Sequence, residues 1–182
     1  MPKAAEMGNN GLIHLYTGEG KGKTTAALGL AVRAAGAGMR VIFAQFMKGR
    51  ETSELEALAK LPNIRVLRSP IDLGWYRRDD EEQKAAFTAV HNAILDQIEA
   101  ETAAGNCDLL VLDEITYPYA YGIIDRERVA GLISRKPERL ELVLTGRRPD
   151  PLFLEKADYI TEMKAVRHPY AKGIPARRGI EF

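Results

Sequence analysis

The sequence contains very few of the residues from which disulfide frameworks and histidine–cysteine metal sites are built. It has one cysteine, Cys107, and three histidines among 182 residues. A single cysteine excludes an internal disulfide and a cysteine-rich metal site. No pair among His14, His91 and His168 has the short ligand spacing of a zinc motif. A disulfide-stapled domain and a structural zinc module are therefore excluded.

Long hydrophobic runs and a strong charge of one sign are also missing. No apolar stretch approaches the roughly 20 residues that span a bilayer, and residues 1–10 carry no signal-peptide core. The net charge is +1, which provides no overall attraction to nucleic acid or membranes. We therefore expect a cytoplasmic protein with no nucleic acid or membrane partner, in which residues 1–10 form a flexible tail.

Short apolar runs instead alternate with amphipathic segments along most of the chain. The expected strands are 11–17, 40–46, 64–68, 109–113, 140–145 and a last core strand at 159–166, with a short extended piece at 178–182. The expected helices are 23–35, 53–60, 79–104, 125–136 and 151–157. This order predicts an α/β fold with an open, mostly parallel sheet and helices on both faces, forming one nucleotide-binding domain over residues 11–182.

Three local features of the expected helices can be stated in advance. Asp79 is placed to cap the long helix. Gly29 lies inside the first helix, which suggests a close approach to another backbone. His91 falls on the long helix and is expected at the boundary between its buried and exposed faces.

The glycine-rich stretch T-G-E-G-K-G-K-T-T occupies residues 17–25, after an apolar run and before an alanine-rich segment. Glycines allow backbone N–H groups to turn inward, and the following helix adds its own unpaired N–H groups. Lys23 can meet β/γ-phosphate oxygens and the Thr24 hydroxyl can ligate Mg²⁺. The expected ATP-binding residues of this loop are Gly18, Glu19, Gly20, Lys21, Gly22, Lys23, Thr24 and Thr25.

This loop departs from the usual G-x-x-x-x-G-K-[ST] pattern, because its first glycine, Gly18, comes one residue late. The alternative interpretation is a glycine-rich turn that happens to precede a helix. The strand before the loop and the helix after it are those that phosphate binding requires. They favour a nucleoside triphosphate site at the carboxyl ends of the strands.

Charged and aromatic residues follow several other expected strands. Asp113 and Glu114 end an apolar strand, where an acid can hold Mg²⁺ or its water, or can simply be a solvated pair. Lys48 and Arg147 can meet phosphate oxygens or carboxylates, or can be ordinary loop charges. Trp75 lies in a loop and either contacts a ligand or plugs the sheet.

Six stretches, taken together in order and spacing, resemble the ATP:corrinoid adenosyltransferases of the phosphate-loop type. They are T-G-E-G-K-G-K-T-T with the following helix, Q-F-M-K-G, L-L-V-L-D-E-I-T-Y, T-G-R, A-D-Y-I-T-E-M and R-H-P-Y-A-K-G-I-P-A-R-R-G-I-E-F. The resemblance extends over residues 11–182 and implies a RecA-like, phosphate-loop NTPase core.

The resemblance implies transfer of the 5′-deoxyadenosyl group of ATP to the Co(I) of a reduced corrinoid, with release of triphosphate, in adenosylcobalamin synthesis or salvage. Lys23 and Arg147 would stabilise the leaving triphosphate. Thr24 and Glu114 would ligate Mg²⁺ (or Mn²⁺), with Asp113 nearby. Arg33 matches an arginine near the nucleotide. A phosphotransferase or simple NTPase, and a non-catalytic ATP-binding regulatory module, are the alternatives.

The same resemblance assigns the corrinoid to the loop around Trp75. Trp75 matches an aromatic that packs beside the corrin and helps to displace its lower axial ligand. Leu73 stands where some relatives have Phe, and residues 1–10 are shorter than the amino-terminal helix with which some relatives cover the site. Both departures concern how the corrin is enclosed. The resemblance further implies a homodimer and an electron donor such as a reduced flavoprotein.

Overall fold

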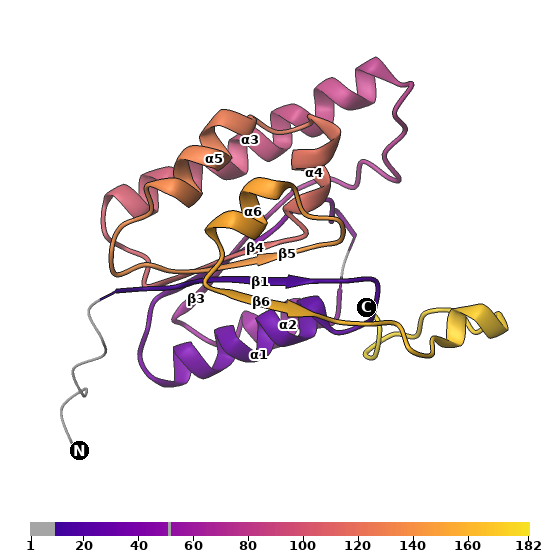
Figure 1. Cartoon of the computed structure of the whole chain (residues 1–182), viewed down its shortest axis with the longest axis horizontal. Helices are drawn as coiled ribbons and strands as arrows, with labels where there is room; N and C mark the ends of the chain where they lie inside the picture. Colours follow the sequence, from indigo (N-terminus) through magenta and orange to yellow (C-terminus); the bar gives the residue numbers. More distant parts are fainter. Residues whose placement is uncertain (1–9, 51) are drawn as a thin grey trace.

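The computed structural model describes residues 10–50 and 52–182, and nearly all of the predicted tail, residues 1–9, lies outside this part. Its centre is a six-stranded sheet in the order β3-β2-β4-β5-β1-β6 (Figure 1). The strands are β1 (Ile13–Thr17), β2 (Val41–Gln45), β3 (Ile64–Arg68), β4 (Leu109–Asp113), β5 (Glu141–Thr145) and β6 (Tyr159–Glu162). All five neighbouring pairs run parallel, as the alternation of strands and helices predicts.

Helices cover both faces of this sheet (Figure 1). One face carries α1 (Lys23–Gly36) and α2 (Glu54–Leu58). The other carries α3 (Glu81–Ala103), α4 (Thr116–Tyr121), α5 (Arg126–Ser134) and α6 (Pro151–Lys156). A 3-10 helix, η1 (Pro169–Lys172), follows β6. The predicted α/β class with helices on both faces is confirmed.

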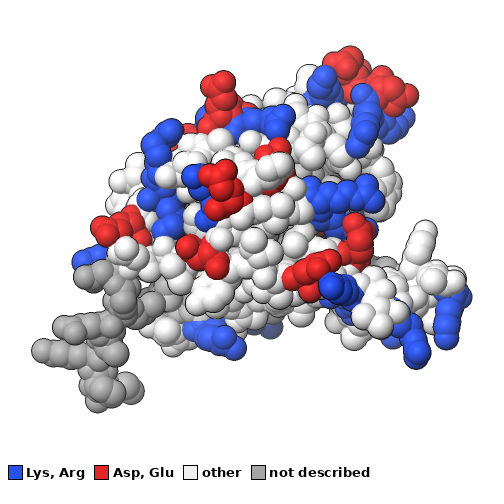
Figure 2. Space-filling model, viewed as in Figure 1, with Lys and Arg blue, Asp and Glu red and all other residues white. Residues whose placement is uncertain are grey.

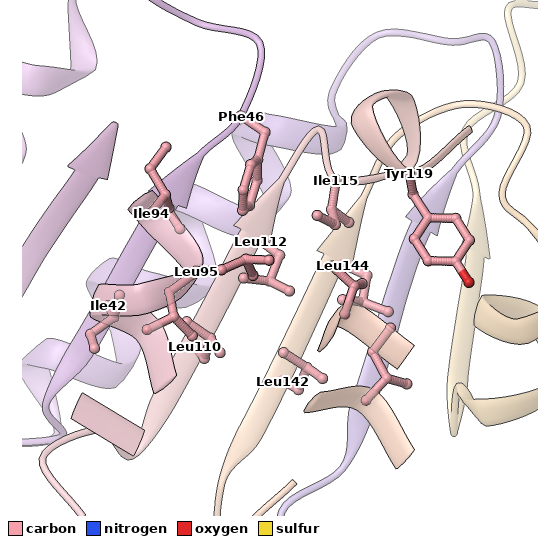
Figure 3. Packing of buried hydrophobic residues seen from close by; sticks show 14 of the residues in the cluster. Ile42, Phe46, Ile94, Leu95, Leu110, Leu112, Ile115, Tyr119, Leu142 and Leu144 are labelled. Carbon is pink, nitrogen blue, oxygen red and sulfur yellow. The ribbon is translucent and has the colours of Figure 1, made fainter. Parts of the chain in front are cut away.

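Two hydrophobic clusters hold these layers together, one on each face of the sheet. On the α3 side, alternate residues of the strands meet Ile94 and Leu95 of α3, and Phe46, Ile115 and Tyr119 close the cluster near the carboxyl ends of the strands (Figure 3). On the α1 side, the buried residues of the helix are all alanines, namely Ala27, Ala31 and Ala34, and Leu28 and Leu30 pack partly buried against the same cluster. Small side chains let α1 lie close to the sheet, which brings its first turn near the ends of the strands.

β2 and β4 are buried along their whole length, because each has a neighbouring strand on both sides and helices on both faces. A strand in this position reads as a continuous apolar run, which is why both were recognisable in the sequence. β5 lies between β1 and β4. The glycine loop after β1 and the acidic pair after β4 are therefore two strand spacings apart, about 10 Å.

Several boundaries differ from the expectation. Asp80, not Asp79, caps α3, since its carboxylate accepts from the backbone N–H of Gln83. β6 ends at Glu162 and is exposed along its length, because it is the edge strand beside β1 and not a core strand. Residues 178–182 form a turn, closed by a bond from the N–H of Gly179 to the carbonyl of Phe182. The short helix α4 was not predicted.

Beyond β6 the chain projects from the domain and then returns, and we call residues 163–178 the C-terminal arm (Figure 1). Lys and Arg side chains gather on this projection (Figure 2). Within residues 10–50 and 52–182, none of the helices combines the length and apolar character needed to cross a membrane.

The expectation of a close backbone approach at Gly29 is wrong. Gly29 lies on the exposed side of α1, and a Cβ built on it would have no atom of the described residues within 4 Å. A Cβ on Gly11, in contrast, would collide with the backbone carbonyl of Leu140. Position 11 therefore requires a glycine, whereas position 29 has room for a larger residue.

These two positions form a matched test of the packing. We expect Gly29→Ala to raise the free energy of unfolding by about 0.5–1 kcal/mol, because alanine loses less backbone entropy in a helix. Gly11→Ala should lower it, because the backbone of Leu140 must move. Chemical denaturation of both variants measures the two changes. An unchanged or lowered stability of Gly29→Ala would contradict the open environment described for this residue.

Candidate functional site

The carboxyl ends of the strands bring together most of the residues singled out in the sequence. The glycine loop follows β1, Lys48 follows β2, Asp113 ends β4 and Arg147 follows β5, all at one edge of the sheet (Figure 1). Because all strands are parallel, their ends meet at this edge, as expected for a ligand site in an open α/β sheet.

The glycine loop depends on the absence of side chains at particular positions. Gly18 and Gly22 have φ of 96° and 116°, in the left-handed region that favours glycine. A Cβ on Gly18 or Gly20 would collide with the backbone carbonyl of Met163, just after β6, and the N–H of Gly20 donates to that same carbonyl at 2.6 Å. Met163 therefore holds one side of the loop in place.

The Lys23 side chain lies back across this loop. Its ammonium donates to the carbonyls of Gly18 and Gly20, at 2.7 Å each. Burial, together with the nearby charge of Arg147, lowers the pKa of Lys23. The ammonium is thus already at the concave side of the loop, where it could exchange carbonyl oxygens for phosphate oxygens.

Asp113 is the centre of the polar network below the loop. Its side chain is fully buried, and its Oδ1 accepts from the hydroxyls of Thr24 at 2.9 Å and Thr145 at 2.7 Å. Its Oδ2 accepts from the ammonium of Lys48 at 2.7 Å. Asp113 is therefore not part of a solvated acidic pair, since each of its carboxylate oxygens accepts from a protein donor.

Glu114 differs from its neighbour Asp113. Its backbone has φ of 62°, and its N–H donates to the Thr145 hydroxyl at 2.8 Å. Its side chain keeps 32% of its surface exposed and lines the cavity beside Thr24. Burial raises the pKa of the Glu114 carboxyl, with the Lys48 charge opposing this. Of these two acids, Glu114 is the one that lines the cavity.

Lys48 meets carboxylates, which resolves the alternative left open by the sequence. Its ammonium also lies 3.8 Å from Glu114 Oε1. Burial alone would lower the pKa of Lys48, but the charges of Asp113 and Glu114 outweigh it and the pKa is raised. Lys48 is therefore a firmly charged internal cation at this site.

Arg147 lies beside the glycine loop, and Arg33 does not. The Arg147 guanidinium pairs with Glu19 of the loop at 3.1 Å. It also lines a cavity of about 260 Å³ with Tyr117 and Tyr121. Arg33 is exposed in the last turn of α1, ten residues or about 15 Å along the helix from Lys23. The structure thus brings Arg147 but not Arg33 to the loop.

A cavity of about 560 Å³ opens next to Thr24, Thr25 and Glu114. This volume lies in the range of small-molecule sites, about 300–1,000 Å³. Trp75 lines it and is 82% exposed, so the alternative in which Trp75 plugs the sheet is wrong. The Arg50 guanidinium lies 6.0 Å from the centre of the Trp75 ring. The cavity is therefore lined both by an exposed aromatic residue and by the first turns of α1.

Leu73 lies two residues before Trp75 but lines a different, smaller cavity. That cavity is formed with Phe87, His91 and Ile94 of α3. The carbonyls of Leu73 and Trp75 both accept from the Gln83 amide at 3.1 Å, which holds this loop on the start of α3. The structure thus separates the two residues that the resemblance assigned to the corrinoid.

Sequence reasoning missed the contribution of the last four residues. Gly179 to Phe182 line the same large cavity as Trp75. Glu181 pairs with Lys21 of the glycine loop at 3.0 Å, and the Phe182 carbonyl accepts from the Ser53 hydroxyl at 3.1 Å. The contacts join positions 160 and 129 residues apart, so no local pattern announces them. The role of Thr145 could have been suspected from the sequence, because Thr145 is a polar residue at the end of an apolar strand.

The oxygen donors at this edge suit a hard divalent cation that arrives with a nucleotide. They are the Thr24 hydroxyl and the carboxylates of Asp113 and Glu114. Among residues 10–50 and 52–182, no three His, Cys, Asp or Glu side chains are grouped as a metal site of their own. The set therefore fits Mg²⁺ that keeps phosphate and water ligands, not a fully protein-bound ion.

Comparison with known proteins was made for the whole chain. The family model described as ATP:corrinoid adenosyltransferase BtuR/CobO/CobP matches residues 9–182. The corrinoid adenosyltransferase of Escherichia coli K12 is 31% identical over 172 residues, covering 94% of this chain and 86% of that protein. The corrinoid adenosyltransferase CobA of Salmonella typhimurium LT2 is 32% identical over 172 residues, with the same coverage of both.

Among solved structures, the KaiC-like protein PH0186 of Pyrococcus horikoshii OT3 superposes with a TM-score of 0.53 at 20% identity. The match covers 85% of this chain and 72% of that one, and it supports the phosphate-loop NTPase-like fold alone. The family model is more specific, since it matches residues 9–182, which include the glycine loop, the acidic strand end and the C-terminal residues. The chain belongs to the ATP:corrinoid adenosyltransferase BtuR/CobO/CobP family.

Proposed function

We propose that this protein transfers the 5′-deoxyadenosyl group of ATP to the Co(I) of a reduced corrinoid and releases triphosphate, in adenosylcobalamin synthesis or salvage. One observation carries the proposal: Thr24 and Thr25, which end the glycine-rich stretch, and an exposed aromatic, Trp75, line the same cavity of about 560 Å³. A triphosphate on the loop would direct the ribose into that cavity. The family membership gives the reaction class.

The residues present match what this reaction needs. The electron pair of Co(I) forms the bond to C5′, the C5′–O bond breaks, and triphosphate leaves with the electrons of that bond. No proton moves in this step, so no general base is required. Of the described residues that line the cavity, none is a histidine. The chemical demand falls instead on stabilising the charge of the leaving group.

Lys23 and Arg147 are the residues that we assign to this task. Lys23 already lies at the concave side of the loop, and Arg147 pairs with Glu19 beside it. Triphosphate oxygens would replace the loop carbonyls on Lys23 and compete with Glu19 for Arg147. Gly18, Lys21, Gly22 and Thr25 complete the proposed ATP site through the loop and the start of α1.

We further propose that Thr24, Glu114 and Asp113 hold Mg²⁺ or Mn²⁺ with the triphosphate. When bound, the ion neutralises negative charge on the leaving group. The Thr24 hydroxyl donates to Asp113, which leaves its lone pairs available to a cation. Glu114 projects into the cavity and Asp113 fixes the Thr24 hydroxyl from behind.

The partners of this reaction are also proposals. The corrinoid would lie against Trp75, whose large exposed ring can exclude water and the lower axial ligand from cobalt. An electron donor such as a reduced flavoprotein would supply Co(I), and the enzyme would act as a homodimer, as the resemblance implies. The use of ATP supports a cytoplasmic location.

One assay tests the function as a whole. The protein is mixed anaerobically with ATP, Mg²⁺ and chemically reduced cobalamin, and the visible spectrum and the phosphate products are followed. We expect the Co(I) spectrum to change to that of the alkylated corrinoid, with one triphosphate per corrinoid. ADP as the product would identify a phosphotransferase or NTPase. ATP binding without corrinoid alkylation would identify a regulatory module.

Lys23→Ala tests the leaving-group role of the loop. Removing a charge aimed at the triphosphate should cost on the order of 3 kcal/mol, a loss of about a hundredfold in rate. Lys60→Ala, which removes an exposed lysine after α2, is the matched control and should react like the wild type. Similar rates for the two variants in the cobalamin assay would reject the loop as the triphosphate site.

Glu114→Gln tests the metal assignment. Glutamine keeps the size of the side chain but loses the charge, so the Mg²⁺ concentration for half-maximal rate should rise by about tenfold or more. Glu54→Gln is the control, because Glu54 lines the same cavity from α2. The Mg²⁺ titration of Glu54→Gln should stay near that of the wild type. Equal shifts in both variants would point to the general charge of the cavity.

Trp75→Ala tests the corrinoid contact. The variant should lose most of its rate when the reaction starts from Co(II) and a flavin or protein reductant, since ligand displacement is then needed. It should lose far less with preformed Co(I). Its stability should change by no more than about 0.5 kcal/mol, because Trp75 is 82% exposed. Ile71→Ala, in the same loop, is the control variant. Equal losses of rate from Co(II) and from Co(I) in Trp75→Ala would reject the corrinoid contact.

A further inference from the structure

The ammonium of Lys48 lies among the three side chains proposed to hold the divalent cation. It lies 2.7 Å from Asp113 Oδ2, 3.5 Å from Thr24 Oγ1 and 3.8 Å from Glu114 Oε1. These are the same three side chains whose oxygens suit Mg²⁺. A lysine thus sits among all the protein donors of the proposed metal site.

The oxygen donors around this ammonium are held in place by their own hydrogen bonds. The Thr24 hydroxyl donates to Asp113 Oδ1 at 2.9 Å. The Thr145 hydroxyl donates to the same oxygen at 2.7 Å, which fixes the Asp113 carboxylate. Asp113 Oδ2 accepts from the ammonium, so removal of the ammonium would free that oxygen for a cation.

The charges explain why a cation is needed here in every state. Asp113 is fully buried and Glu114 is its neighbour, so without a positive charge the two carboxylates would repel in a poorly solvated site. Lys48 supplies that charge, with only 18% of its side chain exposed. A bound Mg²⁺ would supply it instead, and an ammonium a few ångströms from the ion would then be repelled.

The surroundings restrict the exchange to the Lys48 side chain. The backbone before it is held by the bond between the Met47 N–H and His91 Nε2 at 3.4 Å. The backbone after it is held because Gly49 packs against the carbonyl of Ile71, where a Cβ would collide. The four-carbon stem of Lys48 lines the large cavity, so the ammonium can turn into it.

We propose that Lys48 is a tethered cation that occupies the metal position in the nucleotide-free protein and is displaced into the cavity when the divalent cation binds. This rests on the metal placement in the proposed function, but not on the reaction. It makes Lys48 a positioning residue for the metal, which binds weakly alone and firmly with a triphosphate. The displaced ammonium then faces the triphosphate and adds a positive charge to the leaving-group site.

The first test measures Mn²⁺ binding by electron paramagnetic resonance, without ATP or corrinoid. Lys48→Met keeps the stem and removes the competitor, so Mn²⁺ should bind about tenfold tighter or more. Lys48→Arg keeps the charge, and Lys60→Met removes an exposed lysine after α2. Both should bind Mn²⁺ like the wild type. Unchanged or weaker binding to Lys48→Met would overturn the proposal.

A second measurement uses the wild-type protein and so does not depend on the folding of a variant. Brief acetylation followed by mass spectrometry gives the modification of Lys48 relative to Lys21. Mg²⁺ should raise this ratio several-fold as the Lys48 amine leaves Asp113. A modification ratio that stays constant at divalent cation concentrations that fill the site would overturn the proposal. Neither measurement involves adenosyl transfer, so a failure of the proposed function would be seen separately.

Discussion

The arrangement of the site depends on the hydrogen bonds and the ion pair that the buried carboxylate of Asp113 makes. It ends β4, and through its oxygens it joins α1 at Thr24, β5 at Thr145 and the segment after β2 at Lys48. A fully buried carboxylate left unpaired would be costly, so these donors must lie where they do. The carboxylate thereby sets the position of the first turn of α1, and with it the glycine loop. The negative charge of the carboxylate also has to be balanced by a nearby cation. The same side chain therefore determines both the packing of the site and where a cation is held.

The glycine loop is held from a second direction, by parts of the chain that come last. Met163 accepts the Gly20 N–H, and Glu181 pairs with Lys21. The loop is thus shaped between the network of Asp113 on one side and the residues beyond β6 on the other. A phosphate entering the loop would meet groups whose positions are already set, which reduces the reorganisation that binding requires.

The sequence predicted the sheet, the glycine loop and the strand-end residues, because each has a local signature: continuous apolar runs for strands buried on both faces, and Gly-Lys-Thr before a helix. Features that depend on contacts between residues far apart in the sequence were not predictable. His91, expected at a boundary, is buried because the Ile123 carbonyl and the Met47 N–H satisfy its two nitrogens, and burial lowers its pKa to about 4. Tyr159 begins an exposed edge strand because only β1 pairs with it. α4 was missed because it is six residues long and contains Pro118.

The division of labour between buried and exposed groups fits a reaction that needs charge stabilisation and no proton transfer. Asp113, Thr145 and Lys48 are tied to one another, whereas Glu114 and Trp75 project into the cavity. A general base would have to be exposed to substrate with a pKa near neutrality. His91 does not meet that demand, since it is buried and its pKa is about 4. Among the described residues that line the cavity are the cation Lys48, the carboxylate of Glu114 and the aromatic ring of Trp75. A nucleophile that brings its own electron pair, such as Co(I), is what such a site can use.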